Sequence, residues 1–192
     1  MPVQSGLSVF ALVLLFVLLG SRALTLNKKG IKAIVFGETD KSDFLLLPIF
    51  LLFVYTVVAR VFGLPIPIVL ASPFWISAGI GWVGLMLCLA ALTGFAVTLK
   101  SFGDSFRVGI DEKNPDKLVT SGVFSWSRNP IYVCFLLFFL GMFLVHPNIL
   151  LACVLALLAL AIHRQILREE AFLSVHYGKE YEDYRKRVRR YL

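Results

Sequence analysis

Five long hydrophobic segments separated by polar residues dominate the pattern along this chain. They cover roughly residues 7–26, 44–62, 74–99, 131–145 and 149–162. A helix needs about 20 mostly apolar residues to cross the ~30 Å hydrocarbon layer of a membrane. The pattern therefore predicts an all-α, polytopic membrane protein with about five transmembrane helices, which forms a single membrane domain over residues 1–192.

The last two hydrophobic segments are shorter than a full span and are joined by the sequence His146-Pro147-Asn148. So short a connection predicts an antiparallel hairpin, in which Pro147 helps to end one helix and Asn148 caps the next. We expect the opposite ends of both helices to continue through polar surroundings, where they line a cavity.

A short tail helix is predicted after the hairpin. The spacing of Tyr181, Tyr184 and Val188 puts these residues on one helix face. Gly178 precedes them and is expected to end the helix before. We expect the tail helix to pack down beside the hairpin as a lid.

The composition agrees with a membrane protein, since 58% of the residues are hydrophobic and only 16% are charged. A soluble domain of this length would need more polar surface. The first segment resembles the apolar part of a signal peptide, and Gly20-Ser21-Arg22-Ala23 could pass for a cleavage site. Residues 1–10 carry no basic side chain, however, and basic residues follow the segment, so we expect a retained span.

The basic residues indicate an orientation in the membrane. All 19 Lys and Arg residues except Arg60 lie in the first connection, the third connection or the region after the hairpin. Basic connections stay cytoplasmic, which predicts that the N-terminus lies outside and that the polar segments beside the hairpin lie on the cytoplasmic face. The net charge of +7 is then explained by attraction to anionic lipid, so a lipid bilayer and no nucleic acid is the expected partner.

The cysteines and histidines do not predict a metal site. Cys88, Cys134 and Cys153 lie in hydrophobic segments at spacings unlike those of metal ligands, and the three histidines lie at different ends of the hairpin. The chain also lacks the glycine-rich motifs that bind phosphates. The polar stretch 100–128 is longer than a connection requires, which leaves either a functional loop or a plain solvated connection.

A set of motifs on both sides of the hairpin resembles the isoprenylcysteine carboxyl methyltransferase family and, more loosely, the membrane phospholipid methyltransferases. Leu-Val-Thr-Ser-Gly-Val-Phe begins at residue 118, and Arg-x-Pro-x-Tyr begins at residue 128. The hairpin follows, then Glu169-Glu170 and Tyr-Gly-Lys-Glu-Tyr from residue 177. The likeness covers about residues 103–188, and the size and layout resemble compact prokaryotic or archaeal members.

The resemblance implies transfer of a methyl group from S-adenosylmethionine to the α-carboxylate of a prenylated cysteine or a similar lipid-linked substrate, without a metal. It places the catalytic region in residues 100–192, after three spans in residues 1–99. The cytoplasmic cofactor pocket would be formed by the loop before the fourth helix, the hairpin and the tail helix. The implied cofactor-binding residues are Asp116, Lys117, Leu118, Val119, Phe124, Asn129, Pro130, Ile131, Tyr132 and Glu169. The candidate catalytic residues are Arg128, Arg164 and Glu170.

The chain departs from the family pattern at Asn129, where the family has His. A carboxylate such as Glu169 suits the cofactor's ammonium, and donors such as Arg128 or Asn129 suit its carboxylate. A substrate α-carboxyl has a pKa of about 3.5 and is ionised at neutral pH, so its methylation needs positioning more than a base. Methylation of a phospholipid amine requires loss of a proton, which Asn cannot accept, although Glu170 or His163 could.

Several alternatives remain at this point. The same region would suit a phospholipid N-methyltransferase, or a sterol-type membrane reductase that binds a nicotinamide cofactor. A non-enzymatic transporter or scaffold is a third class, but we find no internal repeat and few polar residues within the segments. Charged residues at a helix end beside the bilayer are also common without any function.

Overall fold

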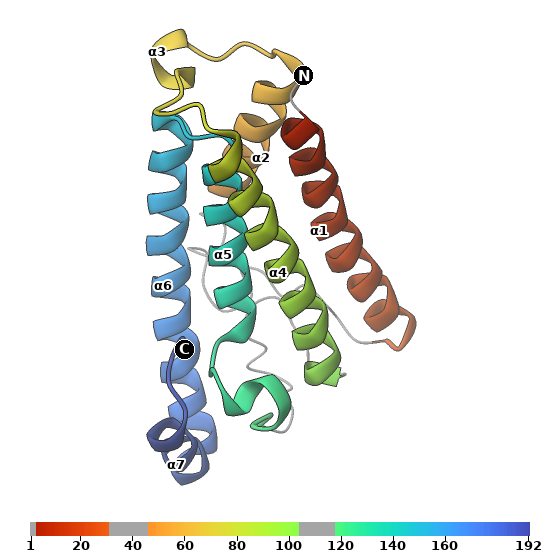
Figure 1. The fold of residues 1–192 in the computed structure, drawn as a ribbon. Coiled ribbons are helices and arrows are strands. Elements are labelled where there is room, and N and C mark those ends of the chain that lie inside the picture. Colours follow the sequence, from red (N-terminus) through yellow and green to blue (C-terminus); the bar gives the residue numbers. More distant parts are fainter. Residues whose placement is uncertain (1–2, 31–45, 104–117) are drawn as a thin grey trace.

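The computed structural model describes residues 3–30, 46–103 and 118–192, and within these ranges the chain is helical without a β-strand. The helices are α1 (Val3–Lys28), α2 (Leu46–Phe62), α3 (Ile68–Ala71), α4 (Ala78–Phe102), α5 (Pro130–Val145), α6 (Ile149–Tyr177) and α7 (Lys179–Arg187), with a 3-10 helix, η3 (Gly122–Ser125), before α5. The five long helices run roughly side by side, with α3 near one end and α7 at the other (Figure 1). The predicted all-α membrane architecture is confirmed.

Each predicted hydrophobic segment coincides with a helix. By length and composition, α1, α4 and α6 are long and apolar enough to cross a membrane, whereas α2 and α5 are shorter apolar helices. Many large apolar side chains on α1, α2 and α4 remain exposed on the outside of the bundle, as lipid contact requires.

Helix α4, which corresponds to the third predicted span, begins later than predicted, at Ala78 instead of residue 74. Ser77 is its N-cap, and its hydroxyl accepts a hydrogen bond from the amide of Ile80 at 3.4 Å. The residues before it are extended, because the amide of Phe74 donates to the carbonyl of Pro147 at 2.7 Å in the α5–α6 turn. This long-range pairing and the short helix α3 have no periodic signal in the sequence, and neither was predicted.

Two glycines let α4 and α5 pack closely along most of their length. A Cβ atom on Gly84 would lie 2.5 Å from the carbonyl oxygen of Gly141, and one on Gly141 would lie 2.6 Å from that of Gly84. No larger side chain fits there without a shift of the backbone. The close crossing holds the last part of α5, next to the turn of the hairpin, against α4.

The hairpin has the predicted form at its turn and beyond. Asn148 caps α6, since its side-chain oxygen accepts from the amide of Leu151 at 2.9 Å. α6 continues for 29 residues, past the end of its apolar part, to Tyr177. Gly178 then ends it at a φ of 53°, and α7 follows with Tyr181 and Tyr184 buried. The predicted continuation of α6, its stop and the tail helix are confirmed. The expected continuation of α5 is wrong, because α5 begins at Pro130, directly at its apolar segment.

Candidate functional site

Three parts of the chain that are distant in sequence meet where α6 extends past its neighbours (Figure 1). They are the residues before α5, the second half of α6, and residues 188–192, which follow α7. α5 begins at Pro130, and proline suits this position because the missing N–H would have no helical partner there. Residues 127–129 therefore stay outside the helix and are free to contact α6 with their side chains.

Glu170, on α6, is the centre of this convergence and only 5% exposed. Arg128 forms an ion pair with its Oε1 at 3.1 Å, and Arg190 forms one with its Oε2 at 2.9 Å. The side-chain amide of Asn129 also donates to Oε1, at 3.1 Å. A buried carboxylate is costly unless its charge is paired and its oxygens are hydrogen-bonded, and both conditions are met here.

Glu169, the neighbouring carboxylate, contacts a different set of residues and is half-buried. The Tyr132 hydroxyl donates to its Oε1 at 2.5 Å, and the Gln165 amide donates to the same oxygen at 3.0 Å. Gln165 in turn accepts from Arg168 at 3.3 Å. Tyr132 lies on the first turn of α5, so this contact fixes the start of α5 against α6.

The tail helix α7 is anchored by its tyrosines. The Tyr184 hydroxyl donates to the carbonyl of Phe124, in η3, at 2.7 Å. Burial, followed by the negative charge of Glu170, raises the pKa of Tyr181 to about 12. Burial, followed by its neighbour Tyr181, raises the pKa of Tyr184 to about 12. Both side chains are therefore neutral phenols at physiological pH, and they hold η3 beside the Glu170 cluster.

A family model for phospholipid methyltransferases matches residues 72–180, more than half of the chain. The chain belongs to this family. The match extends from just before α4 to the start of α7, so it contains both carboxylates of the site and stops before Arg190.

The individual relatives include isoprenylcysteine O-methyltransferases and a metal-resistance protein. The protein-S-isoprenylcysteine O-methyltransferase of Rattus norvegicus is 32% identical over 117 residues, which cover 59% of this chain and 40% of that protein. The enzyme of the same name from Schizosaccharomyces pombe is 32% identical over 105 residues, 53% of this chain and 44% of that one. A nickel-cobalt-cadmium resistance protein, NccN, of Alcaligenes xylosoxydans xylosoxydans is 30% identical over 115 residues, 59% and 50% of the two chains.

These matches confirm the resemblance to isoprenylcysteine carboxyl methyltransferases. The matched part spans half or less of each relative's length. Within the described ranges, no group of three or more His, Cys, Asp or Glu side chains is placed to hold a metal ion. The expectation of a metal-free site stays a prediction.

Most of the predicted site residues lie together at this end of the bundle. Leu118 and Val119 are half-buried in the extended segment that leads to η3. Arg164 is exposed on α6, and within the described part of the chain it forms no hydrogen bond or ion pair with the Glu170 cluster. Asp116 and Lys117 lie outside the described residues. The residues that the structure brings together are Phe124, Arg128, Asn129, Pro130, Ile131, Tyr132, Glu169 and Glu170.

The main residue that sequence reasoning missed is Arg190. The sequence interpretation explained all basic residues after the hairpin, residues 185–190 included, by attraction to anionic lipid at the membrane surface. In the structure Arg190 turns inward to Glu170, while Arg187 is exposed and its Nε donates to the carbonyl of Asp183 in its own helix. Arg190 and Glu170 are 20 positions apart, and the segment between them contains the whole of α7, so no local spacing indicates that they pair.

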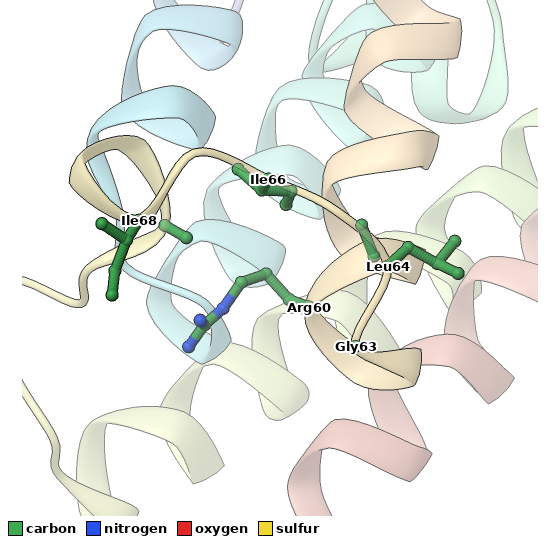
Figure 2. Close-up of a pocket in the computed structure, with 7 residues that line it drawn as sticks. Arg60, Gly63, Leu64, Ile66 and Ile68 are labelled. Atoms are coloured by element: carbon green, nitrogen blue, oxygen red, sulfur yellow. The ribbon is translucent and has the colours of Figure 1, made fainter.

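The structure also contains a cavity of about 260 Å³ at the opposite end of the bundle, between the end of α2 and α3. Figure 2 shows Arg60 extending across it, with Leu64, Ile66 and Ile68 around it. Arg60 is the basic residue that the charge pattern separates from the other eighteen. The cavity is remote from Glu169 and Glu170, so it is not part of the site described above.

Proposed function

We propose that this chain is an S-adenosylmethionine-dependent carboxyl methyltransferase that acts on a prenylated cysteine. The observation that carries the proposal is the contact between Tyr132 and Glu169, which joins the Arg-x-Pro-x-Tyr motif to the Glu-Glu motif across the open end of the hairpin. The names of the relatives support this chemistry and this substrate class. The basic residues around α7 support a site on the cytoplasmic face.

The residues present fit the cofactor's charges. Glu169 offers a carboxylate for the cofactor's ammonium, and the hydroxyl of Tyr132 holds that carboxylate in place. The Nε of Arg128 is buried and has no hydrogen-bond partner among the described residues, so its N–H can serve an acceptor such as the cofactor's carboxylate. The backbone of Leu118 and Val119 and the ring of Phe124 would complete the pocket, together with Asp116 and Lys117.

The bound cofactor would supply an electrophilic methyl group on sulfur. The chain's own task is to orient the substrate carboxylate toward that methyl and to exclude water. Because an α-carboxyl is ionised at neutral pH, with a reference pKa of about 3.5, no base is needed. Asn129 is consistent with this, since its amide donates to Glu170 and to the carbonyl of Arg190 and plays a supporting part.

The roles of the candidate catalytic residues differ in how directly they can act. Arg164 is exposed and would have to reach the substrate from the rim of the site. Arg128 and Glu170 are paired with one another, each with 7% of its side chain exposed. We therefore propose that this pair supports the cofactor-binding residues around it, while the Nε of Arg128 serves the cofactor's carboxylate.

A second candidate function is methylation of a phospholipid amine, which the description of the matching family favours. An amine that is protonated at neutral pH must lose its proton before it attacks the methyl group, and that requires a base. Asn129 cannot be that base. A direct assay with two acceptors, an N-acetylated S-prenylcysteine and phosphatidylethanolamine, separates the two functions by which one becomes methylated.

The first experiment is calorimetric titration of the purified protein in detergent with S-adenosylhomocysteine, with NADPH titrated in parallel. We expect saturable binding of S-adenosylhomocysteine alone. Glu169→Gln removes the negative charge but keeps an oxygen for Tyr132, and should weaken this binding by roughly 10- to 100-fold, as loss of a charge-assisted hydrogen bond does. Glu182→Gln, an exposed acid on α7, is the matched control and should leave binding unchanged. Binding of NADPH alone would instead assign the chain to reductase chemistry.

A further inference from the structure

Residues 188–192 return from the end of α7 toward α6 and the start of α5, and they contact both (Figure 1). The amide of Arg128 donates to the carbonyl of Arg189 at 2.9 Å. The side chain of Asn129 donates to the carbonyl of Arg190 at 3.1 Å. Further along, the Tyr191 hydroxyl lies 2.5 Å from Nδ1 of His163 on α6. The 188–192 segment is thus fixed at both ends.

Arg190 contributes a side-chain contact that differs from these backbone contacts. Its Nε and a terminal nitrogen both donate to Glu170, with distances of 2.9 to 3.2 Å. Oε2 of Glu170 is bound by Arg190, while Oε1 is shared with Arg128 and Asn129. Such a two-pronged contact fixes the plane of a carboxylate as well as its position.

The fixed carboxylate also determines where Arg128 and Asn129 lie. Both side chains bind Oε1, so rotation of the Glu170 carboxylate would move or release them. These two residues directly precede Pro130 and are four and three positions from Tyr132. A displacement of Arg128 or Asn129 would therefore move Tyr132, whose hydroxyl holds Glu169. Glu169 is the residue that we assign to cofactor binding.

We propose that Arg190 is a positioning residue for the methyl-transfer site. The 188–192 segment carries it onto Glu170, and through that carboxylate it holds residues 128–132 in the geometry that binds the cofactor. This inference rests on the proposed function. It assigns a role to a residue outside the part of the chain that the family model matches.

The test compares Arg190→Gln with Arg187→Gln, which removes the same charge from an exposed position three residues earlier. The first readout is amide hydrogen exchange of residues 126–132, measured without any ligand. We expect about tenfold faster exchange in Arg190→Gln than in wild type, which corresponds to one broken network contact. Arg187→Gln should exchange as wild type does.

The second readout is calorimetric affinity for S-adenosylhomocysteine, measured alongside thermal unfolding of each variant. Arg190→Gln should bind about tenfold more weakly while it is still folded. Arg190→Lys keeps the charge but cannot donate from two nitrogens as the guanidinium does, so its affinity should lie between those of Arg190→Gln and wild type. If Arg190→Gln does not fold, Arg190→Lys replaces it in both measurements.

Faster exchange with unchanged affinity would overturn the positioning role, because the segment would then serve stability alone. Unchanged exchange would overturn it as well. A wild-type protein that does not bind S-adenosylhomocysteine would refute the proposed function, and the exchange comparison would still decide whether Arg190 holds residues 128–132.

Discussion

The two ends of the α5–α6 hairpin bury polar groups in different ways. At the turn, His146 and Asn148 are buried, and among the described residues their hydrogen-bond partners are uncharged: Asn148 donates to the carbonyl of His146 at 3.0 Å, and His146 lies 2.8 Å from the hydroxyl of Ser8. At the open end, Glu170 is buried among charged partners from two other parts of the chain. A turn that only has to reverse the chain can use short, neutral contacts.

The neutral end uses hydrogen bonds between uncharged groups. The Ser8 oxygen lies 2.8 Å from the carbonyl of Ser5 and 2.8 Å from Nε2 of His146, and a neutral imidazole can share this contact as donor or as acceptor. The open end instead contains a buried carboxylate, Glu170, that forms ion pairs with Arg128 and Arg190. Such an arrangement costs stability unless every partner is present, and it is typical of sites that recognise charged ligands.

The largest expected effect comes from removal of the central charge at the open end. Glu170→Ala leaves Arg128 buried without its counter-ion, and should lower the free energy of unfolding by about 3–5 kcal/mol. Chemical unfolding in detergent measures this loss. Asn148→Ala is the counterpart at the turn and removes a helix cap worth about 1 kcal/mol. An equal or greater loss in Asn148→Ala would contradict the contrast between the two ends.

The next expected effect is a pH dependence of stability that comes from the turn end of the hairpin. Burial, followed by the positive charge of Arg60, lowers the pKa of His146 to about 4. The unfolded chain, with a histidine pKa of about 6.5, therefore binds a proton that the folded chain refuses, and stability falls as the pH drops from about 6.5 toward 4. The loss attributable to His146 should reach about 2 kcal/mol at pH 5.

Thermal unfolding of wild type and His146→Gln at pH 7 and pH 5 isolates this contribution, since other titrating groups are common to both proteins. The variant is expected to lose less stability between the two pH values. Ser8→Ala keeps the imidazole and should retain the wild-type pH dependence. Identical pH dependence in wild type and His146→Gln would show that His146 is not buried as a neutral group.

The same contrast explains how far the sequence could predict the molecule. The reversal of the chain at the turn depends on Pro147 and on the cap formed by Asn148, which the sequence indicates directly, whereas the contacts of the turn with Ser8 and Phe74 have no local signal. The helices follow from apolar runs. The open end depends on Arg128, Glu170 and Arg190, whose separations along the chain reflect packing and no local rule. The sequence motifs identified Arg128 and Glu170 as site residues but could not predict that they form an ion pair. Arg190 was missed because the basic residues around it were interpreted as a membrane-surface segment.

The smallest effect distinguishes two tyrosines on α7. Tyr184 donates to the carbonyl of Phe124, whereas the buried hydroxyl of Tyr181 has no hydrogen-bond partner among the described residues. Tyr184→Phe should therefore lower the free energy of unfolding by about 1 kcal/mol, since the carbonyl loses its donor. Tyr181→Phe removes only an unpaired polar group from a buried place and should be neutral or slightly stabilising.

Thermal unfolding of the two variants decides this last prediction, because each differs from wild type by a single oxygen. Equal losses would contradict the unpaired state of the Tyr181 hydroxyl. A loss in Tyr184→Phe alone would show that η3 is held to α7 by this bond. The open end would then be stabilised by a neutral contact from the tail helix as well as by the ion pairs of Glu170 on α6, and it would share one feature with the turn.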